Sequence, residues 1–292
     1  MFPSAFEYYA PKTLDEVYGL LAQYGDEAKI LAGGQSLLPM MKLRLAAPSV
    51  LIDIGSLGQL SSATETAEGL SMGALMRHKT IETSHWPHYP LLRETAPWIA
   101  DPLVRNRGTI GGSLAHADPA ADWGAALLAL GASVQIESRD RIRHMALEEF
   151  FVDLYTTALE PQEVLTRIVI PVPATAATFA RYLKLERKVG DFAVVGVAIT
   201  VSLAIDGTVA QAGIGMAAMS GVPFAAHQTE SLLVGRQLTP ALIKEVSESA
   251  SQEGDPESDR RGSAEYKRSM ARVFVERGLS QILQQWESTQ SA

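Results

Sequence analysis

Apolar and polar positions divide the start of the chain into a strand, a helix and further strands. Residues 14–24 carry apolar side chains at helical spacing, and Thr13 stands before them as an N-cap with Glu16 three positions later. Gly25 follows and predicts the end of this helix. Short apolar runs on either side of the helix predict strands, at residues 6–9, 28–34, 49–57 and 68–76.

The middle of the chain alternates between helical and strand patterns. We expect a turn of helix within residues 36–45 and helical pieces within residues 80–99. Residues 121–132 are apolar on every side and predict a buried helix. Two short runs at residues 133–138 and 140–146 predict a hairpin.

The pattern changes near residue 175. Residues 170–180 carry proline, alanine and threonine without periodicity, which indicates a linker. Three long antiparallel strands are predicted beyond it, the last two joined at Asp206-Gly207, and helices follow. These strands span residues 179–188, 193–207 and 208–220, and the helices span 224–235, 239–253 and 262–286. We therefore expect two α+β parts, residues 1–175 and 176–292.

Composition narrows the class of protein. The 292 residues are 47% hydrophobic and 20% charged, as in a soluble globular protein with a real core. The net charge of −8 argues against general binding to nucleic acid or anionic membranes. The chain has no cysteine, which excludes disulfides and cysteine-ligated zinc or iron–sulfur centres. The sequence shows no secretory signal and no apolar run long enough to span a membrane, so we expect a cytoplasmic protein.

Two glycine pairs stand out, in AGGQS at residues 32–36 and in TIGGS at residues 109–113. Paired glycines permit positive φ angles, and the backbone amides of such a loop can hold an anion. Neither motif is the Rossmann G-x-G-x-x-G pattern or carries the lysine of a P-loop. One Gly-Gly alone is equally well a tight turn. The two together favour a ligand with neighbouring phosphates, such as a dinucleotide.

Two carboxylates follow the second glycine pair. Asp122 suits a ribose or ribityl hydroxyl, as an acidic residue does in dinucleotide-binding folds. In the alternative, Asp118 or Asp122 is the N-cap of the helix that follows. His116 together with these two aspartates would make a metal cluster, but their spacing fits no known signature.

A polar strand in the second part carries further candidates. Lys184 could neutralise a reduced anionic cofactor, and Tyr182 or Phe192 could lie on a ring system. The alternative is a solvated strand edge with an aromatic side chain in the core.

Four segments resemble the FAD-binding medium subunit of the molybdenum hydroxylase family, which includes xanthine dehydrogenase and aerobic carbon monoxide dehydrogenase. They read LAGGQSLLPMMKLRLAAP, RNRGTIGGSLAHADPAADW, KLERKVGDFA and DRRGSAEYKRSMA. The resemblance implies a two-subdomain FAD-binding fold of the vanillyl-alcohol-oxidase type, with subdomains of about residues 1–55 and 56–175. It also implies an α+β C-terminal domain over residues 176–292, with a three-stranded antiparallel sheet and a helix bundle.

The resemblance also implies a cofactor site for FAD. The glycine motifs would hold the pyrophosphate, and Phe192 stands where the carbon monoxide enzymes have a tyrosine that shields the flavin ring. Ser113 stands where many members have asparagine. The cofactor-binding residues implied are Leu31, Ala32, Gly33, Gly34, Gln35, Ser36, Leu37, Ile99, Thr109, Ile110, Gly111, Gly112, Ser113, Asp118, Asp122, Leu165, Lys184, Asp191 and Phe192.

By the same resemblance, the chain is the flavin subunit of a multi-subunit oxidoreductase. A small iron–sulfur subunit and a large molybdenum-cofactor subunit are the implied partners, in a dimer of heterotrimers. FAD would pass electrons to an external acceptor, and no catalytic residue or metal ligand is assigned to this chain. Two alternatives stay open, a self-sufficient flavin oxidase of the vanillyl-alcohol type and a non-catalytic nucleotide-binding module.

Overall fold

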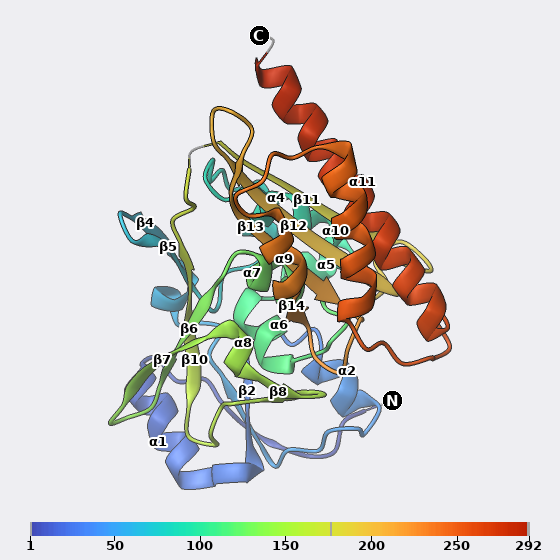
Figure 1. Cartoon of the computed structure of the whole chain (residues 1–292). Helices are drawn as coiled ribbons and strands as arrows, with labels where there is room; N and C mark the ends of the chain where they lie inside the picture. Colours follow the sequence, from blue (N-terminus) through green and yellow to red (C-terminus); the bar gives the residue numbers. More distant parts are fainter. Residues whose placement is uncertain (1, 176, 291–292) are drawn as a thin grey trace.

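The computed structural model describes residues 2–175 and 177–290 (Figure 1). The chain begins with a small parallel sheet of order β1-β3-β2. Its strands are β1 (Glu7–Tyr9), β2 (Ala28–Leu31) and β3 (Val50–Asp53), and α1 (Leu14–Tyr24) packs on them. The predicted helix boundaries are confirmed, because the Thr13 hydroxyl accepts the Glu16 N–H over 3.2 Å and Gly25 has φ +50°.

A five-stranded antiparallel sheet of order β4-β5-β10-β6-β7 follows. Its strands are β4 (Ala63–Thr66), β5 (Gly69–Gly73), β6 (Ser133–Glu137), β7 (Ile142–Ala146) and β10 (Val164–Pro171). The predicted β6–β7 hairpin is confirmed. Helices between β5 and β6 are α3 (His78–Thr83), α4 (Pro90–Thr95), α5 (Pro102–Arg105), α6 (Ile110–His116) and α7 (Asp122–Ala129). The short elements α8 (Leu147–Phe150), β8 (Phe151–Asp153) and β9 (Thr156–Thr157) lead to β10.

The C-terminal part is a sheet of order β11-β12-β13-β14 with three helices. The strands are β11 (Thr178–Leu185), β12 (Val195–Leu203), β13 (Val209–Ala217) and β14 (Phe224–Ala225), and the helices are α9 (His227–Leu233), α10 (Pro240–Glu253) and α11 (Ala264–Gln290). The predicted turn at Asp206-Gly207 is confirmed, with φ +81° at the glycine.

Two predicted boundaries in this region were wrong. The linker predicted over residues 170–180 is shorter, since β10 runs to Pro171 and β11 begins at Thr178, so both ends of the predicted linker pair in the two sheets. The helix predicted from residue 224 begins at His227, because residues 224–225 pair with β13 instead. In both cases hydrogen bonding to a neighbouring strand decided the boundary.

Helix α7 joins the two parts of the chain. Every residue from Asp122 to Ala129 is buried, and the helix packs against β12 and β13. Glycines in β13 allow the close approach, because a Cβ atom on Gly213 or Gly215 would lie within 2 Å of a carbonyl oxygen of α7. On the other face of this sheet lie α10 and α11 (Figure 1). The described residues contain no helix both long and apolar enough to cross a bilayer.

Candidate functional site

The first glycine motif is an open turn between β2 and α2 (Leu37–Lys42). Gly34 has φ +74°, which favours glycine; Gly33 is half-buried and Gln35 is exposed. In the part of the chain that the structure describes, no acceptor pairs with the backbone N–H groups of residues 33–37. Ser36 occupies the N-cap position of α2, but its hydroxyl makes no capping hydrogen bond. A row of unpaired N–H groups at a turn is suited to an anion.

The second glycine motif is not a loop. Gly111 and Gly112 lie in the first turn of α6, and neither has a positive φ angle. The Gly112 N–H donates to the hydroxyl of the N-cap residue Thr109 (3.1 Å), and the Gly111 N–H donates to the Ala74 carbonyl (2.9 Å). The other N–H groups of this turn are paired as well. The prediction of a positive-φ loop was therefore wrong here, because docking onto the segment after β5 takes up the amides.

The two motifs pack against each other. A Cβ atom on Gly33 would lie 2.4 Å from the Arg107 carbonyl oxygen and 2.7 Å from the Gly108 Cα. On the Gly112 side, a Cβ would lie 4.0 Å from the Ala32 Cβ. The glycines therefore allow two backbones to meet, and they place the open turn of residues 33–37 beside the start of α6.

Two hydroxyls complete this end of the site. Ser36 and Ser113 are half-buried, and among the described residues neither hydroxyl has a hydrogen-bond partner. Open amides with adjacent hydroxyls suit the pyrophosphate of a dinucleotide such as FAD. The residues present therefore fit the implied cofactor. The unpaired backbone amides come from the first motif, since those of the second motif are already paired.

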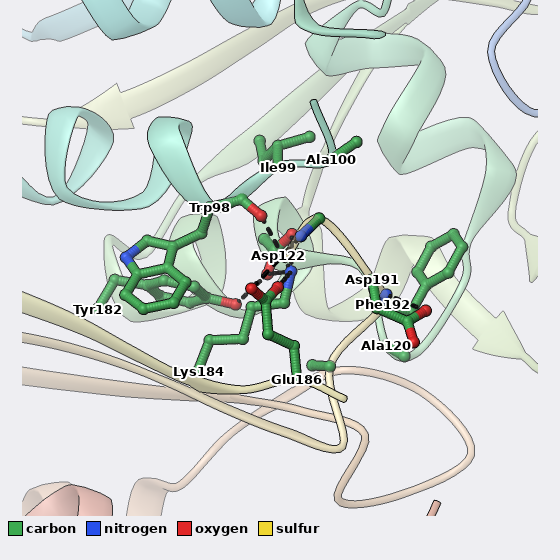
Figure 2. Close-up of polar contacts among 12 residues, drawn as sticks. Trp98, Ile99, Ala100, Ala120, Asp122, Tyr182, Lys184, Glu186, Asp191 and Phe192 are labelled. Carbon is green, nitrogen blue, oxygen red and sulfur yellow. Dashed lines mark hydrogen bonds and ion pairs between the residues drawn. The ribbon is translucent and has the colours of Figure 1, made fainter. Parts of the chain in front are cut away.

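A buried charge cluster forms the other part of the site (Figure 2). The Tyr182 hydroxyl donates to Asp122 Oδ1 over 2.6 Å, and Lys184 Nζ donates to Asp122 Oδ2 over 3.1 Å. Lys184 Nζ also donates to the Trp98 carbonyl over 3.0 Å, and Glu186 Oε2 lies 3.6 Å from it. The Lys184 side chain is only 1% exposed. Three segments distant in sequence thus meet at one ammonium group.

Burial sets the electrostatics of this cluster. Removal from water raises the pKa of Asp122, and the charge of Lys184 and the hydrogen bond from Tyr182 oppose that shift. Burial and the neighbouring Asp122 carboxylate hold the pKa of Tyr182 well above its usual value. Tyr182 is therefore a neutral donor to Asp122, and its ring lies in the core rather than on an open surface.

Asp118 and Asp122 have different surroundings. Asp118 accepts the Ala120 N–H over 2.9 Å and the Tyr155 hydroxyl over 3.3 Å, which fixes the turn between α6 and α7. The alternative that one of them caps α7 was wrong, because the N-cap is Ala121, with no side-chain cap. The described residues contain no group of three side chains able to hold a metal ion.

Phe192 lies at the surface, 43% exposed, in the loop after β11. The Arg261 guanidinium lies 5.7 Å from its ring centroid and 3.6 Å from the Asp191 carboxylate. The alternative of a core aromatic therefore does not hold for Phe192. A cation from the C-terminal part covers the ring instead.

Leu165 and Ile99 each lie close to one end of the site. Leu165 is buried in β10, and the carbonyl of the next residue, Thr166, accepts the Ala74 N–H over 2.9 Å. The Ala74 carbonyl in turn accepts the Gly111 N–H of the second motif. Ile99 is half-buried beside the carbonyl that Lys184 binds (Figure 2).

Sequence reasoning missed His78. Its ring is buried against Gly108, and its Nδ1 accepts the Trp123 Nε1–H over 3.0 Å. Burial, with the charges of Arg77 and Arg105, lowers the pKa of His78 to about 4. The neutral ring thus links the second motif to α7, and nothing in its sequence neighbourhood indicates this contact.

Comparison with known families decides the assignment. A family model described as the FAD binding domain in molybdopterin dehydrogenase matches residues 4–173, and the CO dehydrogenase flavoprotein C-terminal domain matches residues 180–282. The chain belongs to the FAD-binding subunit family of the molybdenum hydroxylases. The resemblance stated from the four sequence segments is thereby confirmed.

Full-length relatives agree with this membership. The chain is 38% identical over 282 residues to the carbon monoxide dehydrogenase medium chain of Afipia carboxidovorans, covering 96% of this chain and 97% of the relative. It is 32% identical over 283 residues to the caffeine dehydrogenase subunit beta of a Pseudomonas species, covering 96% and 95%.

Solved structures confirm the predicted fold class. The carbon monoxide dehydrogenase from Hydrogenophaga pseudoflava superposes with a TM-score of 0.91 at 40% identity, covering 96% of this chain and 98% of that chain. Quinoline 2-oxidoreductase from Pseudomonas putida superposes with a TM-score of 0.90 at 34% identity, covering 98% and 99%.

Proposed function

We propose that this chain is the FAD-carrying subunit of a multi-subunit molybdenum hydroxylase. It accepts electrons from a small iron–sulfur subunit and passes them to an external acceptor, while a large subunit holds the molybdenum cofactor. The observation that carries this proposal is the end-to-end match to medium chains of such dehydrogenases. The family assembly implies a dimer of heterotrimers, and the absence of cysteine is compatible with the cytoplasm.

The chain's own residues bind and orient the cofactor. The N–H groups of residues 33–37, with the hydroxyls of Ser36 and Ser113, would hold the pyrophosphate. At the other end, Lys184 and Asp122 would lie near the flavin, where Lys184 holds a positive charge in a buried setting. When bound, FAD supplies the conversion between one-electron and two-electron transfer.

The other proposed FAD-binding residues can be grouped by their position in the site. Leu31, Ala32, Gln35 and Leu37 flank or belong to the open turn, and Thr109 to Ser113 form the start of α6. Ile99, Asp118, Asp191 and Phe192 lie beside the charge cluster or in the turns next to it (Figure 2), and Leu165 is buried in β10. We propose a domain boundary at residues 175–176, which is supported by family models that end at residue 173 and begin at residue 180.

The substrate is selected elsewhere in such a complex. Relatives of this one chain are named for carbon monoxide, caffeine and quinoline enzymes, so the medium subunit is common to dissimilar substrates. This supports substrate recognition by the large partner. It also favours the electron-transfer role over a self-sufficient oxidase or a nucleotide-binding module.

Purification of the chain with its native partners tests the proposal. We expect the complex to contain FAD, released by heating and identified by its absorption spectrum, together with an iron–sulfur subunit and a molybdenum subunit. The isolated chain should bind FAD without oxidising the substrate of the complex. A colourless chain that takes up no added FAD and brings no partner would contradict the assignment.

A further inference from the structure

Residues 97–100, here called the carbonyl strap, run between two cationic side chains, those of Arg105 and Lys184. Arg105 Nη1 donates to three of its four carbonyls, at 3.3 Å to Pro97, 3.0 Å to Ile99 and 3.1 Å to Ala100. The remaining carbonyl, of Trp98, faces the other way and accepts from Lys184 Nζ over 3.0 Å (Figure 2). Every carbonyl of the strap is therefore held by a positive charge.

Arg105 is itself fixed in place. It ends α5, its side chain is 11% exposed, and its Nε donates to Glu82 Oε2 over 3.0 Å. A planar guanidinium can serve one carboxylate and several carbonyls at once, whereas the single ammonium of lysine cannot reproduce this geometry. Glu82 fixes the orientation of the Arg105 guanidinium, and the carbonyls of the strap accept its hydrogen bonds.

The backbone of the carbonyl strap is in a strained conformation at one residue. Ala100 has φ +44°, in the left-handed region that non-glycine residues rarely adopt. Gly190 packs against it so closely that a Cβ there would lie 3.0 Å from the Ala100 carbonyl. The strap thus touches the loop that carries Asp191 and Phe192. Three hydrogen bonds from Arg105 offset the cost of this conformation.

We infer that Arg105 is a positioning residue for the flavin end of the site. It acts through the strap, whose Trp98 carbonyl fixes Lys184, and Lys184 in turn fixes the Asp122 carboxylate. The inference rests on the proposed function, because it assigns that cluster to the flavin rather than to the pyrophosphate. It also explains the first arginine of RNRGTIGGS, whose hydrogen bonds among the described residues go to Glu82 and to the strap rather than to the open turn of residues 33–37.

A comparison of two ligands tests this role in the full chain. FAD and ADP share the pyrophosphate, but only FAD carries the flavin ring. Arg105→Lys keeps the charge and loses the geometry, so we expect the Kd for FAD to rise roughly tenfold while the Kd for ADP stays within about twofold. The visible absorption band and the midpoint potential of the bound flavin should also shift, because Lys184 and Asp122 lose their alignment.

Controls separate this role from general support of the fold. Arg93 is an exposed arginine of α4 without a side-chain partner among the described residues, so Arg93→Lys should change neither ligand's Kd. Glu82→Gln should give a smaller shift in the same direction as Arg105→Lys, and it serves if Arg105→Lys does not fold.

The outcomes are distinguishable. Equal loss of FAD and ADP binding, or a lower melting temperature with an unchanged flavin spectrum, potential and Kd, would overturn the positioning role. Failure of the unmodified chain to bind FAD would instead overturn the proposed function.

Discussion

The two glycine motifs are alike in sequence and different in the folded chain. Around Gly33-Gly34 the backbone turns through a positive φ angle and leaves the N–H groups of residues 33–37 unpaired. Around Gly111-Gly112 the backbone is helical, and its N–H groups are already bonded to Thr109 and to the segment after β5. The same dipeptide thus supplies donors in one place and close packing in the other.

The difference shows why a glycine pair alone is weak evidence for phosphate binding. Absence of a side chain permits a ligand to approach, and it equally permits another part of the protein to do so. At Gly111 the space is taken by Ala74, which lies where a Cβ would be. What identifies the binding motif is the free N–H group, and a sequence does not display it.

The largest expected effect comes from filling the packed motif. Gly111→Ala would place a Cβ 2.4 Å from the Ala74 Cβ, so we expect a loss of about 3 kcal/mol in the free energy of unfolding, with FAD binding lost in parallel. Denaturant titration measures the change. Gly58→Ala is the control, because its Cβ would meet no atom within 4 Å. A stable Gly111→Ala protein that lacks only FAD would instead give both motifs the same role.

The next largest expected effect is a dependence of the free energy of unfolding on pH, caused by His78 beside the packed motif. His78 has a pKa of about 4 when folded and about 6.5 when unfolded. Because the unfolded chain binds the proton first, the stability from the neutral ring is complete above pH 6.5 and is lost as pH falls toward 4. We expect this loss to be about 2–3 kcal/mol. Denaturant titrations at several pH values should show that the free energy of unfolding depends less steeply on pH in His78→Gln than in the wild type. Equal dependence on pH would exclude the assignment.

The smallest effect on stability should come from the open motif, where the effect on binding dominates. Gly34→Ala forces a side chain into φ +74°, at a cost of about 1–2 kcal/mol, and should raise the Kd for FAD roughly tenfold. Gly235→Ala is the control for the backbone strain alone, since it has φ +79° and no neighbour within 4 Å of its Cβ, whereas a Cβ on Gly34 would lie 2.9 Å from Leu38 Cδ1. It should be destabilised by the strain and bind FAD normally. Flavin fluorescence titration measures both, and equal affinities would remove the open turn from the site.

Local chemistry determined several elements without help from the fold. Thr13 caps a helix that Gly25 ends, and Asp206-Gly207 turns one strand into the next, since each depends on neighbouring residues only. The order and flanks of the glycine motifs were also sufficient to predict the family and its fold class, which the family models and solved structures confirm. Their individual contacts with FAD stay predictions.

Tertiary contacts decided the rest. The start of α6 docks where the distant Ala74 carbonyl accepts the Gly111 N–H, and residues 170–171 joined β10 because β5 offers them partners. Asp122 meets Lys184 across 62 positions of sequence, and His78 meets Trp123 across 45. No local pattern encodes such a pair, because the partners lie far apart in sequence and the cost of burying each group is offset only where the fold brings the two together. The sequence by itself therefore determined the family and the turns, and only the tertiary structure decided which amides are free and which charges are paired.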